Sequence, residues 1–239
     1  ILDNFYKVYH KLFSNLIFKT PKAITVYGKS ISKYAAQVGA KKVLIIPTAT
    51  NISSKPKTKS IRTEFKIPKN QKIILFVGLI STRKGIDRII DAISKNRSEN
   101  IVTLLVGSGP ERPKFENTVK KLNLEDKIIF TGSRKDIQNF YSEADIFLFP
   151  SRGEGMPGAI MEAMTFKLPI ITSKIPGTMD LVDKNSAILT NDYASNLKKL
   201  IRNKMLRAKL GKSAKSQSKN YTWKDVSNKY MKLYSKILQ

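Results

Sequence analysis

Between residues 72 and 172 the chain repeats short apolar runs that are each followed by an amphipathic segment, and this pattern constrains the fold most strongly. The apolar runs are continuous and rich in Ile, Leu, Val and Phe, which is typical of parallel strands buried on both faces. The segments between them have helical spacing. We therefore expect strands over 72–79, 101–106, 128–131, 145–149 and 169–172, and helices over 84–94, 111–122, 135–142 and 158–166.

Alternating strands and helices predict an α/β fold with a Rossmann-like parallel sheet that helices cover on both faces. In such sheets ligands bind beyond the carboxyl ends of the strands, near the point where the strand order reverses. The loops that follow the strands are therefore the candidate sites.

The regions on either side of this core are less regular. We expect a helix over 1–18, a strand over 23–26, a helix over 30–38 and a strand over 42–46. Residues 47–72 are polar and basic, which indicates a linker or an exposed loop. The tail from residue 193 is predicted to be helical, and its last helix carries an apolar stripe of Trp223, Val226, Tyr230, Leu233 and Ile237.

The net charge of +26 is concentrated outside the regular region. Residues 1–72 carry +13, residues 73–194 carry +1 and residues 195–239 carry +12. An anionic membrane, nucleic acid or anionic substrates would each attract such flanks, and a genome that favours Lys would produce the same composition. The chain has no cysteine and one histidine, His10, which excludes disulfides, thiolate zinc sites and a cysteine nucleophile.

The first candidate loop, residues 78–85, places Arg83 and Lys84 at the start of a predicted helix. Cations at a helix N-terminus oppose the helix dipole, and a bound anion such as phosphate would remove that repulsion. The second loop begins Gly107-Ser108-Gly109, like a dinucleotide fingerprint, but Arg112 occupies the position of the third glycine. A tight turn between strand and helix is therefore the better interpretation than a nicotinamide site.

The third loop follows the strand that ends at Pro150, and it is rich in glycine. Pro157 suits a first helical turn, so the backbone amides of residues 155–158 are free to meet an anion. Glu154 and Glu162 could each accept hydrogen bonds from neighbouring hydroxyls of a sugar or ribose. The alternative is that Glu154 caps the helix and Glu162 is solvated, although the apolar neighbours of Glu162 imply that its carboxylate needs a partner.

The glycine-rich loop with Glu154 and Glu162, together with the short motifs named below and their order along the chain, resembles the nucleotide-sugar domain of family 4 glycosyltransferases, which are retaining enzymes of the GT-B fold. The spacing Glu154-x(7)-Glu162 resembles the E-x(7)-E signature of that family. The remaining landmarks are Phe76-Val77-Gly78, Lys84-Gly85, Val106 to Glu111, Phe130-Thr131-Gly132, Ala144 to Ser151, Glu162-Ala163-Met164 and Pro169-Ile170-Ile171.

The resemblance implies a role for each matching residue. Glu154 would contact hydroxyls of the donor sugar, Glu162 the ribose hydroxyls, and Lys84 the diphosphate. Amides around the start of the helix would hold phosphate or sugar, and the sugar would transfer with retention of configuration. No metal or other cofactor is expected. The further donor-binding positions are Gly155, Met156, Pro157, Gly158, Gly78, Gly132 and Arg134.

The resemblance also implies a domain organisation, namely the C-terminal half of a GT-B fold. Residues 1–50 would be the end of an acceptor domain, 51–71 a linker or loop, 72–220 the donor domain and 221–239 a helix that crosses back. We therefore expect the chain, which begins at Ile1, to be a fragment of a protein longer by about one domain.

One departure concerns the loop after the first strand, where Leu79 stands in place of the family's usual Arg, and Arg83 could replace that cation.

The acceptor would be a glycan or a lipid-linked sugar, at the cytoplasmic face of an anionic membrane. The alternatives are a non-catalytic or split donor-binding subunit, and a nucleic-acid-binding protein. The last lacks a recognition motif, so no nucleic acid is expected as a partner.

Overall fold

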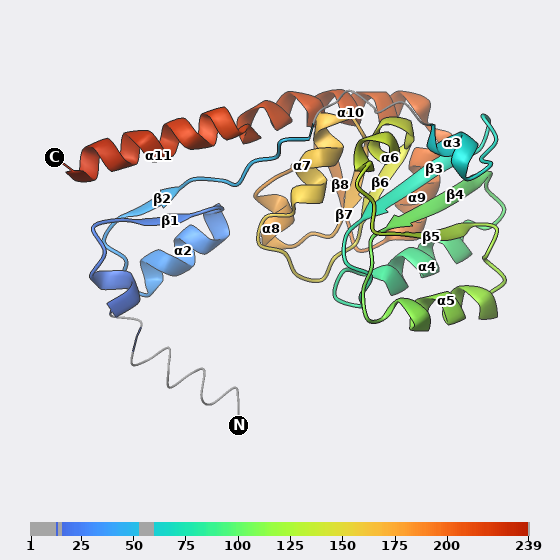
Figure 1. Ribbon diagram of the computed structural model, residues 1–239, viewed down its shortest axis with the longest axis horizontal. Coiled ribbons are helices and arrows are strands. Elements are labelled where there is room, and N and C mark those ends of the chain that lie inside the picture. The colour runs from blue at the N-terminus through green and yellow to red at the C-terminus, as the bar shows by residue number, and fades with distance from the viewer. Residues whose placement is uncertain (1–12, 14–15, 53–59, 239) are drawn as a thin grey trace. The chain divides into compact units, whose positions relative to one another are not determined.

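The computed structural model describes residues 13, 16–52 and 60–238. The chain divides into two compact units, one formed by Ile1–Ala49 with Tyr221–Gln239 and the other by Thr50–Asn220 (Figure 1). The helix expected over residues 1–18 lies largely outside the described residues. Within the described part of the chain, no helix is long and apolar enough to span a membrane.

The smaller unit contains two parallel strands, β1 and β2, with helices α2 and α11. One core cluster of this unit consists of Ile46, Val226 and Leu233, so α11 packs its apolar stripe against the residues around β2. Tyr230 and Ile237 of the same stripe are half-buried in this cluster. The bounds are β1 Ile24–Val26, α2 Lys29–Gln37, β2 Val43–Ile45 and α11 Trp223–Leu238.

The larger unit is built on a six-stranded parallel sheet with the order β5-β4-β3-β6-β7-β8. The predicted α/β fold with a parallel sheet is confirmed, and the elements predicted over 72–172 agree with the observed ones to within two residues at each end. The strands are β3 Lys72–Val77, β4 Ile101–Val106, β5 Ile128–Gly132, β6 Ile146–Phe149, β7 Ile170–Thr172 and β8 Ala187–Leu189.

Helices cover both faces of this sheet, with α4, α5 and α9 on one face and α6 and α7 on the other (Figure 1). Every residue of β4, β6 and β7 is buried, as expected from their continuous apolar runs. The helices are α3 Ile61–Glu64, α4 Ile86–Ser94, α5 Arg112–Lys121, α6 Ile137–Glu143, α7 Gly158–Thr165, α8 Pro176–Met179, α9 Tyr193–Arg202 and α10 Lys204–Ser218.

The structure differs from the sequence-based expectations in three places. Residues 60–71, expected to be a linker or an exposed loop, contain α3, and Ile61 is fully buried. Helix α8 and strand β8 were not predicted. The helical tail is interrupted at Asn203, whose side chain accepts a hydrogen bond from the Leu206 amide and so begins a new helix, α10.

The sheet order places a topological switch point between β3 and β6. The helices that follow these neighbouring strands, α4 and α7, lie on opposite faces of the sheet (Figure 1). The loops after β3 and β6 therefore lie at the position where ligands bind in sheets of this kind. Both loops were singled out in the sequence.

Candidate functional site

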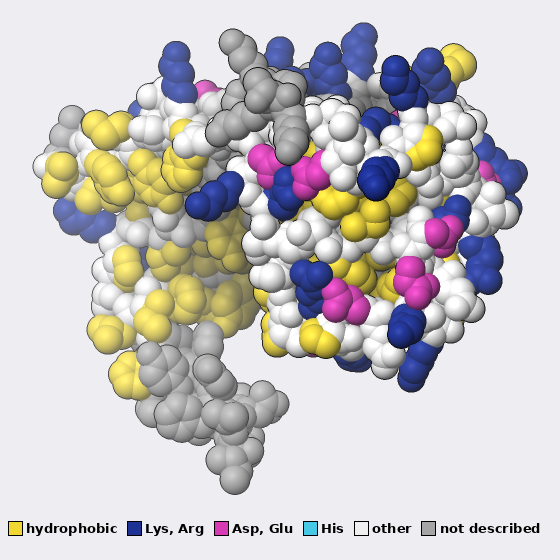
Figure 2. Space-filling view, turned by 45° about the vertical axis from the view of Figure 1, so that its right-hand side comes forward, with side chains coloured by type: hydrophobic (Ala, Val, Ile, Leu, Met, Phe, Trp, Pro, Cys, Tyr) yellow, Lys and Arg dark blue, Asp and Glu magenta, His cyan; other side chains and the backbone are white. Residues whose placement is uncertain are grey.

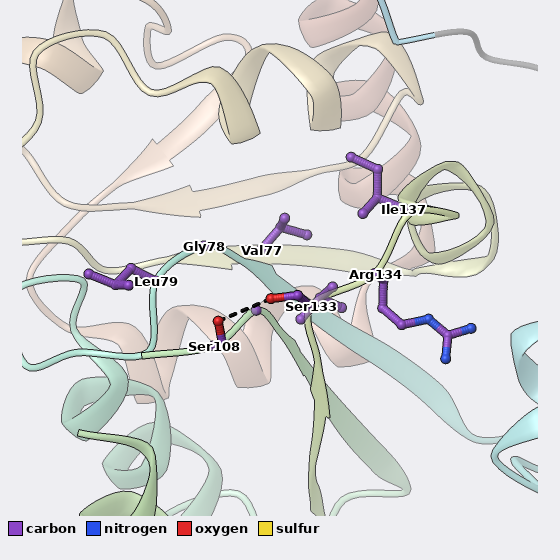
Figure 3. A pocket seen from close by; sticks show the side chains of 9 residues that line it. Val77, Gly78, Leu79, Ser108, Ser133, Arg134 and Ile137 are labelled. Carbon is purple, nitrogen blue, oxygen red and sulfur yellow. Dashed lines mark hydrogen bonds between the residues drawn. The ribbon is translucent and has the colours of Figure 1, made fainter. Parts of the chain in front are cut away.

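Beyond the ends of β3, β4 and β5 lies a pocket of about 320 Å³ (Figure 3). The loops after β3 and β4 meet closely here, because a Cβ atom at Gly107 would lie 1.9 Å from the carbonyl oxygen of Gly78. Gly107 also has a positive φ of 141°, which favours glycine. The lining residues are Val77, Gly78, Leu79, Val106, Gly107, Ser108, Ser133, Arg134 and Ile137.

Two serine hydroxyls lie in this pocket, and each belongs to a residue that follows a strand. The hydroxyl of Ser133, after β5, donates to the hydroxyl of Ser108, after β4, at 3.0 Å (Figure 3). Leu79 is 46% exposed at the rim. Neither serine was singled out as a site residue, although each lies two residues beyond the end of a predicted strand, and that position was the available signal.

Arg134 lines the same pocket, but its guanidinium points away from Ser108 and Leu79 (Figure 3). The guanidinium is 2.8 Å from Asp136 and 2.7 Å from Glu64, and these bonds raise the pKa of Arg134 above its usual value. The charge of Arg134 is therefore balanced by two carboxylates. Gly132, predicted with it, ends β5 with a φ of +74°.

An ion pair joins the loops after β3 and β6 at the switch point. Lys84 Nζ, from the loop after β3, lies 2.6 Å from Glu154 Oε1, in the loop after β6. Their side chains are only 16% and 8% exposed. Ser151 donates to the same Glu154 oxygen at 2.6 Å, and the Lys84 ammonium lies 5.4 Å from the centre of the Phe149 ring. Two of the residues predicted for one site are thus in direct contact.

Glu154 does not cap α7, so that alternative for Glu154 is wrong. The helix begins after Pro157, and no side chain in the described residues caps it. Within the same residues, the backbone amides of Gly155, Met156 and Gly158 have no acceptor. The helix N-terminus therefore presents free N–H groups beside the loop that carries Glu154, which is the arrangement that binds anions.

Glu162, on α7, has the partner that its apolar surroundings require. Tyr141, on α6, donates its hydroxyl to Glu162 Oε2 at 2.7 Å. Burial raises the pKa of Glu162, and the hydrogen bond from Tyr141 offsets this only in part. The alternative that Glu162 is a solvated surface residue is wrong. Tyr141 was not chosen as a site residue.

Arg83 reaches from the loop after β3 to the loop after β6, where its Nη1 donates to the Gly153 carbonyl at 2.7 Å. Lys84, Arg83 and Glu154 therefore come together at the switch point. Charged side chains of opposite sign also lie next to one another over one face of this unit (Figure 2), in keeping with the near-neutral charge of residues 73–194.

The fold is that of an α/β domain of the Rossmann-like class. The profile of the family described as "Glycosyl transferases group 1" matches residues 57–217. The chain belongs to this family.

Curated relatives include an O-antigen biosynthesis glycosyltransferase of Escherichia coli, WclY, which is 33% identical over 52% of this chain and 34% of its own length. An uncharacterised glycosyltransferase of Haemophilus influenzae is 28% identical over 81% of this chain and 61% of its own length. The chain thus spans between about a third and three fifths of these relatives.

Solved structures of glycosyltransferases share the fold. Sucrose-phosphate synthase from Thermosynechococcus elongatus superposes with a TM-score of 0.83 at 23% identity, over 95% of this chain and 61% of that one. Anabaena HepE in complex with UDP-glucose superposes with a TM-score of 0.84 at 19% identity, over 99% of this chain and 70% of that one. The fold is therefore the one found in GT-B glycosyltransferases.

Proposed function

We propose that this chain binds a nucleotide-diphosphate sugar and that the protein containing it transfers the sugar, a hexose, to an acceptor with retention of configuration, as in family 4. The observation that carries the proposal is the contact between Lys84 and Glu154 at the switch point, next to the free amides that begin α7. A cation, a carboxylate and a helix N-terminus together suit a ligand with both phosphates and hydroxyls.

In this proposal the negative charge that develops on the leaving diphosphate is stabilised by Lys84 and by the amides of Gly155, Met156 and Gly158. Both are held in place before the donor arrives, so little reorganisation accompanies the reaction. Glu154 accepts hydrogen bonds from hydroxyls of the sugar, and Glu162 accepts them from the ribose. Because cations and amides of the chain carry the electrostatic role, the reaction needs no metal.

The acceptor in this proposal is a glycan or a lipid-linked sugar. Relatives whose names specify O-antigen and amylovoran biosynthesis support a cell-envelope acceptor. The basic flanks would attract an anionic membrane surface that carries such an acceptor. Sedimentation with anionic vesicles at low salt tests membrane attraction, and failure to bind would contradict this role of the basic flanks.

A thermal-shift screen with UDP-, GDP-, ADP- and dTDP-glucose tests donor binding by the chain as it stands. We expect one of them to raise the melting temperature, since a ligand that binds only the folded state stabilises it. Calorimetry then gives the affinity for the selected donor. Wild-type protein that binds none of the four and no other nucleotide sugar would refute the proposal.

Arg83→Ala and Glu162→Gln variants locate the bound donor. If Arg83 substitutes for the arginine that Leu79 replaces, Arg83→Ala weakens binding of the nucleoside diphosphate. Unchanged affinity would reject that compensation. Glu162→Gln should weaken the binding of a nucleotide but not of its 2′,3′-dideoxy analogue, which lacks the ribose hydroxyls.

A further inference from the structure

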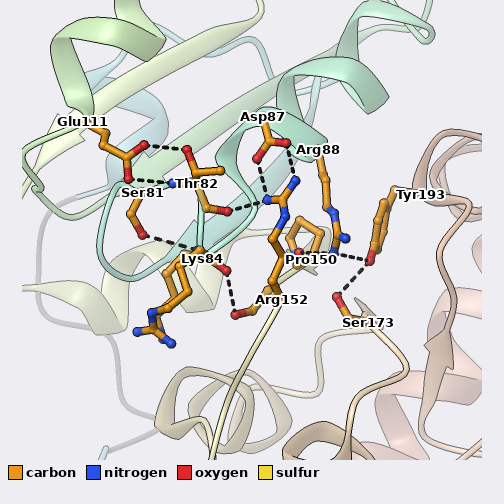
Figure 4. A network of polar contacts seen from close by, with 12 residues as sticks. Ser81, Thr82, Lys84, Asp87, Arg88, Glu111, Pro150, Arg152, Ser173 and Tyr193 are labelled. Carbon is orange, nitrogen blue, oxygen red and sulfur yellow. Dashed lines mark hydrogen bonds and ion pairs between the residues drawn. The ribbon is translucent and has the colours of Figure 1, made fainter. Parts of the chain in front are cut away.

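The segment that carries Lys84 is held from two sides by side chains of other loops (Figure 4). On one side Glu111, after β4, accepts hydrogen bonds from the Thr82 amide at 2.9 Å and from the Thr82 hydroxyl at 2.5 Å. On the other side Arg152, after β6, donates through Nη1 to the Thr82 carbonyl. Both polar backbone atoms of Thr82 are therefore occupied by side chains from elsewhere in the chain.

Arg152 holds the next residue as well. Its backbone amide donates to the Arg83 carbonyl at 2.9 Å, and the Ser151 hydroxyl donates to the same oxygen at 3.2 Å. The backbone on the N-terminal side of Lys84 is thus bonded to the loop that also carries Glu154. The cation and its carboxylate partner are fixed relative to one another by these bonds and not by their own contact alone.

The guanidinium of Arg152 is in turn fixed by Asp87, in the first turn of α4. Two parallel bonds of 2.7 and 2.6 Å join them. Burial raises the pKa of Asp87, but the hydrogen bonds and the charge of Arg152 outweigh it and hold that pKa below its usual value. Asp87 therefore stays ionised at neutral pH, and the geometry of the pair is that of a bidentate, oriented contact.

We propose that Arg152, held by Asp87, is a positioning residue that sets the orientation of Lys84 towards the donor diphosphate without contacting the donor. Arg152 directs its donors to Thr82 and Asp87, so its role is to fix the loop. Losing the pair would let the Ser81–Lys84 turn relax, and Lys84 would then have to be ordered when the diphosphate binds. This inference rests on the proposed function, because it concerns the same diphosphate site.

Asp87→Asn separates this role from direct binding by Arg152. The substitution removes a negative charge near the site and therefore makes the local potential more positive. If Arg152 bound phosphate itself, freeing it from Asp87 would strengthen the binding of the diphosphate. If Arg152 positions Lys84, the same substitution weakens the binding of the diphosphate. Asp91→Asn is the matched control, since Asp91 lies on the same helix and its carboxylate contacts only the exposed Lys95 among the described residues.

The experiment is calorimetry on the full 239-residue chain with UDP, UMP and uridine, or with the corresponding series of the base that the thermal-shift screen selects. We expect Asp87→Asn and Arg152→Lys to lower the affinity for the diphosphate by about tenfold, the change that one charge-assisted hydrogen bond produces. The affinity for the nucleoside should change by less than about twofold, because uridine lacks the phosphates that Lys84 engages in the proposed function. Asp91→Asn should match the wild type throughout.

Two results would overturn the inference. A diphosphate affinity in Asp87→Asn equal to or above that of the wild type would remove the positioning role. An equal loss for diphosphate and nucleoside would indicate general damage to the fold, and circular dichroism of the same samples would show it. Wild-type protein that binds no nucleotide would refute the proposed function itself, an outcome distinct from variants that retain full diphosphate affinity.

Discussion

Lys84 and Glu154 are separated by 70 residues in the chain, and their charged atoms lie 2.6 Å apart. The sheet brings them together because β3 and β6, which precede them, are neighbours. A pair this poorly exposed has little solvent to screen it. Each partner therefore depends on the other, and a donor that engages either of them must act on both.

The first prediction concerns this dependence. Lys84→Met leaves the carboxylate of Glu154 buried without its cation, so we expect the free energy of unfolding to fall by about 3 kcal/mol. Diphosphate affinity should fall by at least about tenfold, the equivalent of one charge-assisted contact. Urea unfolding and calorimetry measure the two effects.

The control for that prediction is the double variant Lys84→Met/Glu154→Gln. Removing both charges should restore much of the stability but none of the diphosphate affinity, since stability depends on the pairing and binding on the cation itself. Recovery of both properties would argue against a direct role of Lys84 with the diphosphate.

The second prediction concerns pH. Glu162 accepts hydrogen bonds best as a carboxylate, and burial raises its pKa above the usual 4.5. Affinity for the selected nucleotide sugar should therefore be constant near neutral pH. It should fall as the pH drops through that raised pKa, at a higher pH than an ordinary glutamate would produce. A nucleotide sugar is the right probe because its diphosphate diester does not titrate in this range.

Two variants check the origin of that pH dependence. Glu162→Gln should abolish it, because the amide does not titrate. Tyr141→Phe removes the hydrogen bond that lowers the pKa of Glu162, so the midpoint should move to higher pH. A midpoint that stays in place in Glu162→Gln would assign the titration to another group.

The third prediction concerns metal ions. Lys84, Arg83 and the amides at the start of α7 supply the positive charge in the proposed reaction, so excess EDTA should leave donor affinity unchanged. Transfer by the parent protein should also be unaffected. Calorimetry measures the donor affinity once with EDTA and once with magnesium chloride. An affinity that requires magnesium would contradict the proposed electrostatics.

The fourth prediction concerns Gly177, which packs against the glycine-rich loop. A Cβ atom there would lie 2.2 Å from the Glu154 carbonyl oxygen and 2.4 Å from that of Gly155. Gly177→Ala should displace this loop, cost about 1–3 kcal/mol in stability and weaken donor binding. For Gly153→Ala, no described atom lies within 4 Å of the new methyl group, so its melting temperature should match the wild type. Equal stability of the two variants would show that the close approach does not constrain the loop.

The sequence predicted the central strands and the two loops at the switch point because periodicity and strand-end position are local signals. It did not predict β8, whose apolar run is limited to Ala187, Ile188 and Leu189 between Ser186 and Thr190. The sequence predicted that Glu162 needs a partner, but it did not indicate that Tyr141 provides it. The contact of Arg152 with Asp87 had no signal, because the two residues are 65 positions apart in the sequence and meet only when α4 and the loop after β6 are folded.

The position of β3 and β6 inside the sheet also determines which parts of this protein tolerate substitutions. Strands paired on both sides belong to the most stable part of a fold, so the loops that carry Lys84 and Glu154 are anchored to that part. The pocket residues Ser133 and Arg134 follow β5, an edge strand, where substitutions disturb fewer neighbours. In the proposed function, substitutions can therefore accumulate at this margin of the sheet while the residues around Lys84 and Glu154 stay fixed.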